Sequence, residues 1–163
     1  MGASVWPLAA TLALLAACPA LAAEPPKRGT PLTGAEIRQL FDNNTVDSVV
    51  GVYDSTARGF HHPDGELDIY GSVRYFDHDK QRMDTYERTD TGDWWVEGDL
   101  YCIHPHKIAF GFTDCLEVRR DGDELLFYFT QCTLKSSDYC AKGRLGGRGN
   151  VLPGDQVIPA LTN

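Results

Sequence analysis

Residues 115–130 read CLEVRRDGDELLFYFT, and this stretch indicates the fold most directly. Asp121-Gly122-Asp123 separates two segments with apolar side chains, and an Asp-Gly linkage in that position is typical of a β-hairpin. Other turn signals, such as Pro63-Asp64-Gly65 and Asp77-His78-Asp79-Lys80, recur about every 8–12 residues along the chain. This spacing predicts a mainly β protein, a small antiparallel β-barrel or sandwich.

The remaining strands are predicted from β-rich or alternating segments between such turns. Thr91-Gly92-Asp93 is read as a turn, Gly98-Asp99 as an interruption, and residues 143–150 as too rich in glycine for a regular element. The predicted strands cover residues 46–53, 67–74, 82–88, 94–97, 100–103, 115–120 and 124–130.

One short helix is predicted before the strands. Thr33 is a natural N-cap, and Glu36 completes a capping box three residues later. Ile37 and Phe41 would share an apolar face, and Asn43 favours a stop because it tolerates the left-handed conformation. We expect this helix to close an end or an edge of the β structure.

The size and charge of the chain limit its class. Its 163 residues fit one domain, and 23 acidic against 15 basic side chains give a net charge of −8. Proteins that bind nucleic acid or anionic membranes through charge need the opposite balance. We therefore expect no nucleic-acid partner.

The first 23 residues predict a cleavable signal peptide. They contain no Asp, Glu, Lys or Arg, and Leu8 to Ala17 forms an apolar segment. Ala20-Leu21-Ala22 supplies the small side chains of a cleavage site. This predicts a periplasmic or secreted protein with a linker over 24–31, a β domain over 32–142 and a glycine-rich C-terminal tail over 143–163.

Cys18 supports a second interpretation of the same segment. Leu15-Ala16-Ala17-Cys18 resembles a bacterial lipobox, in which cleavage occurs before the cysteine and its thiol carries a lipid. The protein would then be anchored to the outer membrane, and we expect membrane contact only through that lipid. The sequence leaves both cleavage sites open.

The other four cysteines, Cys102, Cys115, Cys132 and Cys140, predict two disulfides, because an even number in a small exported chain forms a disulfide framework. Three connectivities are open. Neighbour pairing is favoured, since each neighbouring pair flanks a hairpin or loop.

Trp94 and Trp95 are candidate ligand-binding residues. Consecutive strand residues face opposite sides, so one should be in the core and the other should face solvent or a groove. The outward tryptophan would be either a ligand platform or a residue covered by the helix or a loop.

His104 and His106 are candidate metal ligands. If residues 102–106 are extended, both imidazoles lie on one face and could hold zinc or copper. His61, His62 or His78 would complete the site. The alternatives are an exposed loop and an acid–base role.

Several of these segments together resemble a family of small exported proteobacterial proteins of unknown function. The motifs run from Leu32-Thr-Gly-Ala-Glu-Ile through Asn44-Thr45-Val46 and Pro63-Asp64-Gly65 to residues 92–102, GDWWVEGDLYC, and Cys115-Leu-Glu-Val118. The resemblance implies an export signal, a compact β domain and a Cys102–Cys115 disulfide, and it carries no established reaction. Gly92-Asp93-Trp94 is also similar to the Gly-x-Trp of lipocalin-like barrels.

The sequence thus favours an exported, non-enzymatic binding module whose partner is a protein or a small molecule. The chain contains no nucleophile elbow and no phosphate loop, which favours a non-enzymatic role, and no cofactor is predicted. The alternative is a metal-binding or metal-dependent hydrolytic protein that uses His104 and His106.

Overall fold

The computed structural model describes residues 26–51, 54–133 and 140–157. These residues contain one α-helix, α1 (Gly34–Phe41), and one 3-10 helix, η1 (Ile108–Gly111). Their strands are β1 (Thr30–Pro31), β2 (Asn44–Val50), β3 (Ser55–His61), β4 (Glu66–Asp77), β5 (Arg82–Glu97), β6 (Leu100–Pro105), β7 (Asp114–Asp121), β8 (Glu124–Cys132) and β9 (Leu145–Pro153).

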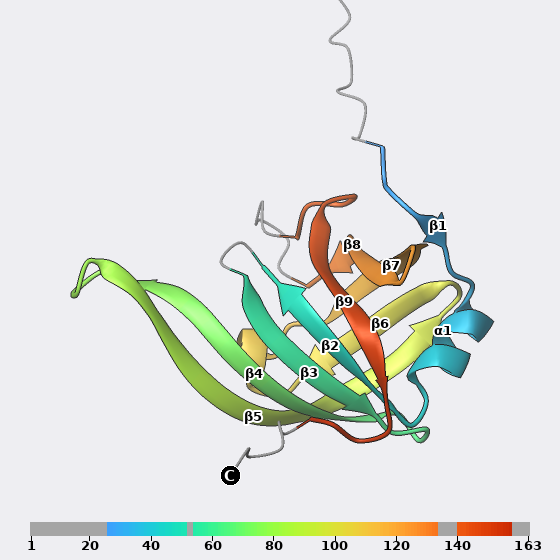
Figure 1. Ribbon diagram of the computed structural model, residues 1–163, viewed down its shortest axis with the longest axis horizontal. Helices are drawn as coiled ribbons and strands as arrows, with labels where there is room; N and C mark the ends of the chain where they lie inside the picture. The colour runs from blue at the N-terminus through green and yellow to red at the C-terminus, as the bar shows by residue number, and fades with distance from the viewer. Residues whose placement is uncertain (1–25, 52–53, 134–139, 158–163) are drawn as a thin grey trace, which may run out of the picture.

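Eight of these strands, β2 to β9, form a closed antiparallel barrel (Figure 1). The order around the barrel is β7-β6-β5-β4-β3-β2-β9-β8, and β8 pairs with β7 to complete the circle. The predicted mainly β fold with one short helix is confirmed, as a barrel. Short β1, at the end of the predicted linker, pairs with Arg119 and Arg120 of β7.

Strand β9 corrects the prediction that residues 143–150 form no regular element. Leu145–Pro153 lies between β2 and β8 and closes the barrel. Its glycines fit because the neighbouring backbones are close: a Cβ on Gly149 would lie 2.3 Å from the carbonyl oxygen of Asp47. The expected C-terminal tail therefore contains a barrel strand.

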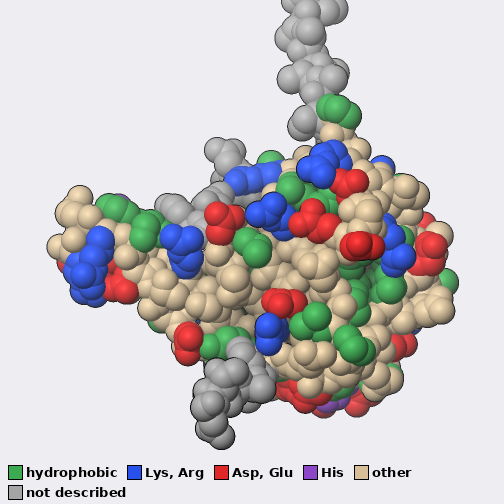
Figure 2. Space-filling model, in the orientation of Figure 1, with side chains coloured by type: hydrophobic (Ala, Val, Ile, Leu, Met, Phe, Trp, Pro, Cys, Tyr) green, Lys and Arg blue, Asp and Glu red, His purple; other side chains and the backbone are tan. Residues whose placement is uncertain are grey.

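Strand β5 corrects a second prediction. Thr91-Gly92-Asp93 is not a turn, because β5 runs unbroken for 16 residues through it. Gly92 serves the close approach of β6, where a Cβ would lie 2.6 Å from the His104 carbonyl oxygen. The long β4–β5 hairpin projects well beyond the barrel (Figures 1 and 2), with Tyr75, Met83 and Tyr86 among its exposed side chains. Strand β3 was also not among the predicted strands.

Helix α1 closes one end of the barrel. Thr33 and Glu36 form the predicted capping box, and Asn43 ends the segment in the left-handed region with φ 58°. The helix turns Ile37 and Phe41 inward, where both are fully buried. The buried face of this amphipathic helix therefore forms the floor of the barrel.

Two disulfides join Cys102 to Cys115 and Cys132 to Cys140, which is the favoured neighbour pairing. Cys102 and Cys115 are directly opposed on β6 and β7. Two disulfides in a chain of this size indicate an oxidising, extracytoplasmic location. Within the described residues, no helix has the length and apolar character needed to cross a membrane.

Candidate functional site

The interior of the barrel contains a cavity of about 170 Å³. It exists because inward side chains alternate with outward ones: on β6, Tyr101, Ile103 and Pro105 line the cavity, whereas Cys102 and His104 do not. Most of the remaining lining is aliphatic or aromatic, including Val46, Val50, Leu67, Leu116, Phe127 and Phe129. The cavity is thus an apolar space that could receive a ligand.

The floor of the cavity is aromatic. Phe41 from α1 packs its ring 5.0 Å from the rings of both His61 and Tyr101. Nε2 of His61 lies 2.8 Å from the Tyr101 hydroxyl. Burial lowers the pKa of His61 to about 4, although the backbone carbonyls of Asn44 and Gly59 act in the opposite direction. Burial also raises the pKa of Tyr101, so both groups are neutral at pH 7.

Asp114, at the start of β7, places a carboxyl group on the cavity wall. Its Oδ1 is buried, and no group of the described residues forms a hydrogen bond with it. Burial raises the pKa of Asp114 to about 6. Buried acceptors are normally bonded, so an unbonded carboxylate oxygen in an apolar cavity suits a ligand with a hydrogen-bond donor.

The two tryptophans face opposite sides of β5, as predicted. Trp94 is 2% exposed and packs at the floor, where its Nε1 donates to the carbonyl oxygen of His62 and Arg38 lies over its ring. Trp95 is half-buried and is opposed by Cys102 in the β5–β6 pairing. Of these two residues, Trp95 is therefore the one placed to meet a ligand on the outer surface.

The outer face of the barrel brings His104 and His106 together, with ring centroids 5.7 Å apart. The third residue near them is Asp93, which is opposed by His104 in the β5–β6 pairing. The other histidines lie elsewhere: His61 at the floor, His62 beside Asp68, and His78 beside Phe76 near the tip of the projecting hairpin. None of those three belongs to the His104–His106 cluster among the described residues.

A second group of potential ligands consists of Glu97, Cys102 and Cys115. Its two sulfur atoms are joined in a disulfide. They are therefore not the thiolates that bind a metal ion.

Sequence reasoning missed Asp93 and Asp114. Asp114 precedes Leu116 and Val118 with the strand period of two, which places it on the inward face once β7 is known. Asp93 was hidden by the expected turn at residues 91–93, because only a continuous β5 pairs it with His104.

No known protein family, curated protein or solved structure matches this chain. The resemblance to small exported proteobacterial proteins therefore stays a prediction.

Proposed function

We propose that this protein is an exported binding module that holds one small molecule inside its barrel. The observation that carries the proposal is the apolar cavity inside the barrel with the unbonded Asp114 Oδ1 on its wall. Eight-stranded barrels are wide enough to hold one small ligand, as lipocalins do. The resemblance of Gly92-Asp93-Trp94 to the lipocalin-like Gly-x-Trp agrees with this role.

The size of the cavity restricts the ligand. An apolar cavity of about 150 Å³ in another protein accommodates benzene, and the present cavity is about 170 Å³. We therefore expect a compact body with a single ring or a short branched chain. Burial of its apolar surface would supply most of the binding free energy.

The polar lining restricts its chemistry. The His61–Tyr101 pair shares a hydrogen bond of 2.8 Å and carries no charge at neutral pH, and Nδ1 of His61 is buried without a partner among the described residues. Asp114 has a raised pKa of about 6, so it is largely ionised at pH 7 and lacks a donor for Oδ1. An amine on the ligand would supply both the proton donor and the opposite charge. The favoured class is a small apolar amine.

Benzylamine, with benzyl alcohol and benzoate as analogues, tests this proposal by calorimetry and ligand-observed NMR. We expect one-to-one binding in the order amine, alcohol, carboxylate. Ala57→Phe would fill the cavity, and Asp114→Asn would remove the charge, so each should weaken amine binding at least tenfold. Thr56→Phe adds the same ring at an exposed position, and Asp123→Asn removes an exposed carboxylate, so both should bind normally.

The proposal fails if none of the three probes binds, or if binding is the same in Ala57→Phe and Asp114→Asn as in the unmodified protein. Binding that survives Asp114→Asn but not Ala57→Phe would contradict the amine class while retaining the cavity as the site.

The cellular place of this module is the periplasm or the exterior, with an outer-membrane lipid on Cys18 as the alternative. The two disulfides support export, whereas residues 1–23 lie outside the described residues. The intact mass of the exported protein tests both forms, because signal cleavage near Ala22 and lipidation at Cys18 give different masses. Retention of Met1 with free thiols would contradict export.

A further inference from the structure

The outer surface of β5 and β6 carries a compact group of two imidazoles and one carboxylate. Asp93, His104 and His106 each offer a ligand atom, and these three atoms all lie within 4.8 Å of one another. Antiparallel pairing places Asp93 directly opposite His104. His106 follows two residues after His104, just beyond the end of β6. The group is thus assembled by strand register.

The spacing of these atoms suits a small metal ion. Nε2 of His106 lies 3.2 Å from Oδ2 of Asp93. Zinc bonds of about 2.0–2.1 Å in tetrahedral geometry require ligand atoms about 3.3 Å apart. One edge of the tetrahedron is therefore already present, and His104 offers its ligand atom within 4.8 Å of both other atoms.

Two threonine hydroxyls orient the imidazoles. Nδ1 of His104 lies 3.2 Å from Oγ1 of Thr113, and Nδ1 of His106 lies 3.2 Å from Oγ1 of Thr91. When the hydroxyl accepts from Nδ1–H, the proton is on Nδ1 and the Nε2 lone pair is free for a metal; at His106, zinc would replace the proton shared between Nε2 and Oδ2 of Asp93. Both rings therefore have the second contact that is usual for histidine ligands of metal ions.

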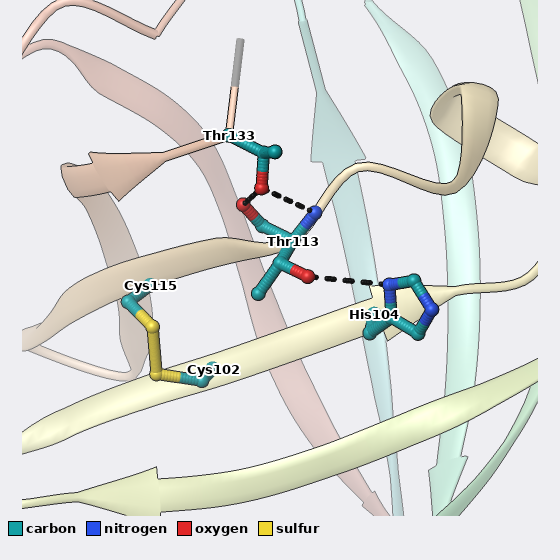
Figure 3. The surroundings of a disulfide bond; sticks show 5 residues. All are labelled: Cys102, His104, Thr113, Cys115 and Thr133. Atoms are coloured by element: carbon teal, nitrogen blue, oxygen red, sulfur yellow. Dashed lines mark hydrogen bonds between the residues drawn. A yellow bond between two sulfur atoms is a disulfide. The ribbon is translucent and has the colours of Figure 1, made fainter. Parts of the chain in front are cut away.

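The position of Thr113 is itself fixed by neighbouring contacts (Figure 3). Its backbone N–H donates to Oγ1 of Thr133, and the Thr133 hydroxyl donates back to the Thr113 carbonyl oxygen. The disulfide between Cys102 and Cys115 holds β6 against β7, two residues away from His104 on β6 and from Thr113, which directly precedes β7. The hydroxyl that orients His104 is thus held from two sides.

We propose that Asp93, His104 and His106 form a surface site for one zinc ion. Two imidazole nitrogens and one carboxylate oxygen are a donor set that zinc accepts, and three protein ligands leave a fourth position open for water or an external ligand. The site lies on the outer face, and Asp93, His104 and His106 do not line the cavity, so it is independent of ligand binding inside the barrel.

Zinc titration of the full exported protein, purified without a His-tag and stripped with a chelator, tests this site. We expect one zinc ion per chain by calorimetry, and imidazole ¹⁵N shifts that identify Nε2 of both rings as ligands. His104→Ala, His106→Ala and Asp93→Asn should each weaken binding at least about tenfold, because loss of even an outer contact typically costs 10–100-fold. His78→Ala is the matched control, since it removes an exposed histidine outside the cluster.

The threonines provide a second test. Thr91→Val and Thr113→Val should each weaken zinc binding about 10–100-fold, because they remove the hydroxyl that orients a ring. Thr91→Ser and Thr113→Ser retain that hydroxyl and should restore the affinity. Circular dichroism confirms folding of each variant.

The proposal is overturned if the protein shows no saturable one-to-one zinc binding. It is also overturned if the His104→Ala/His106→Ala double variant binds zinc as tightly as the unmodified protein. Benzylamine binding in that double variant should be unchanged, which separates this site from the cavity.

Discussion

The Tyr101 hydroxyl and Nε2 of His61 share a hydrogen bond of 2.8 Å at the closed end of the barrel. Both side chains are buried, and Phe41 covers them from the helix. Because burial lowers the pKa of His61 to about 4, the ring is neutral at pH 7. The floor of the cavity is therefore polar but uncharged.

This pair predicts acid sensitivity. The folded-state pKa of His61 lies below the unfolded value of 6.5, so acid favours the unfolded chain. The contribution of neutral His61 is present above pH 6.5 and is lost as the pH falls toward 4, by about 3 kcal/mol. Urea unfolding at pH 7 and pH 4 measures it. His61→Gln, which does not titrate, should show a smaller fall; an equal fall would contradict the prediction.

Asp114 predicts the opposite dependence. Burial raises its folded-state pKa from 3.8 to about 6. The folded protein therefore loses stability as the pH rises from 3.8 through 6, because the buried carboxyl group becomes ionised. Asp114→Asn should raise the unfolding free energy at pH 7 by about 1 kcal/mol, after allowance for solvent screening of this partly exposed group. The gain should vanish below pH 3.8. Asp123→Asn is the exposed control, and an equal gain there would exclude burial as the cause.

The close contact of β9 with β2 at Gly149 predicts that a larger residue there destabilises the barrel. Gly149→Ala would place a Cβ 2.3 Å from the Asp47 carbonyl oxygen and 2.9 Å from Cα of Ser48. Because backbone must move, we expect a loss of about 1–3 kcal/mol in urea unfolding. Arg148→Ala, at the exposed neighbouring position, should change stability little. Equal stability of the two variants would contradict the tight β2–β9 contact.

The Cys102–Cys115 disulfide predicts a linked change in stability and metal binding. Its sequence separation is 13, and closure of a loop of that order is worth about 3 kcal/mol in the chain-entropy model. Cys102→Ala/Cys115→Ala should lower the unfolding free energy by about that amount. It should also weaken zinc binding, since β6 is released from β7 beside His104 and Thr113. Unchanged zinc affinity in the folded double variant would show that strand pairing alone positions Thr113.

The features that could be predicted depend on residues close together in the chain. The capping box joins Thr33 to Glu36, and the Asp121-Gly122-Asp123 turn joins β7 to β8. Such contacts need only local backbone geometry, so their residue types indicate them directly. The opposite orientations of Trp94 and Trp95 follow from the same local rule.

The features that were missed depend on distant segments. Glycines in β9 favour a strand only because β2 approaches so closely that a side chain would not fit at Gly149. Gly92 likewise indicates a turn from the sequence alone, and only its pairing with β6 shows that it belongs to a strand. Local propensity is weak in such strands, and packing against neighbours decides them.

By itself, the amino-acid sequence determined the β class, the capped helix, the even set of four cysteines and the pair His104 and His106. Each of these follows from residue types or from residues close together in the chain. Only the tertiary structure decided that β9 closes the barrel, that Asp114 faces the cavity and that Asp93 joins the two histidines. The physical reason is register: pairing between strands places side chains that are distant in sequence at contact distance, and no local pattern records which strands pair.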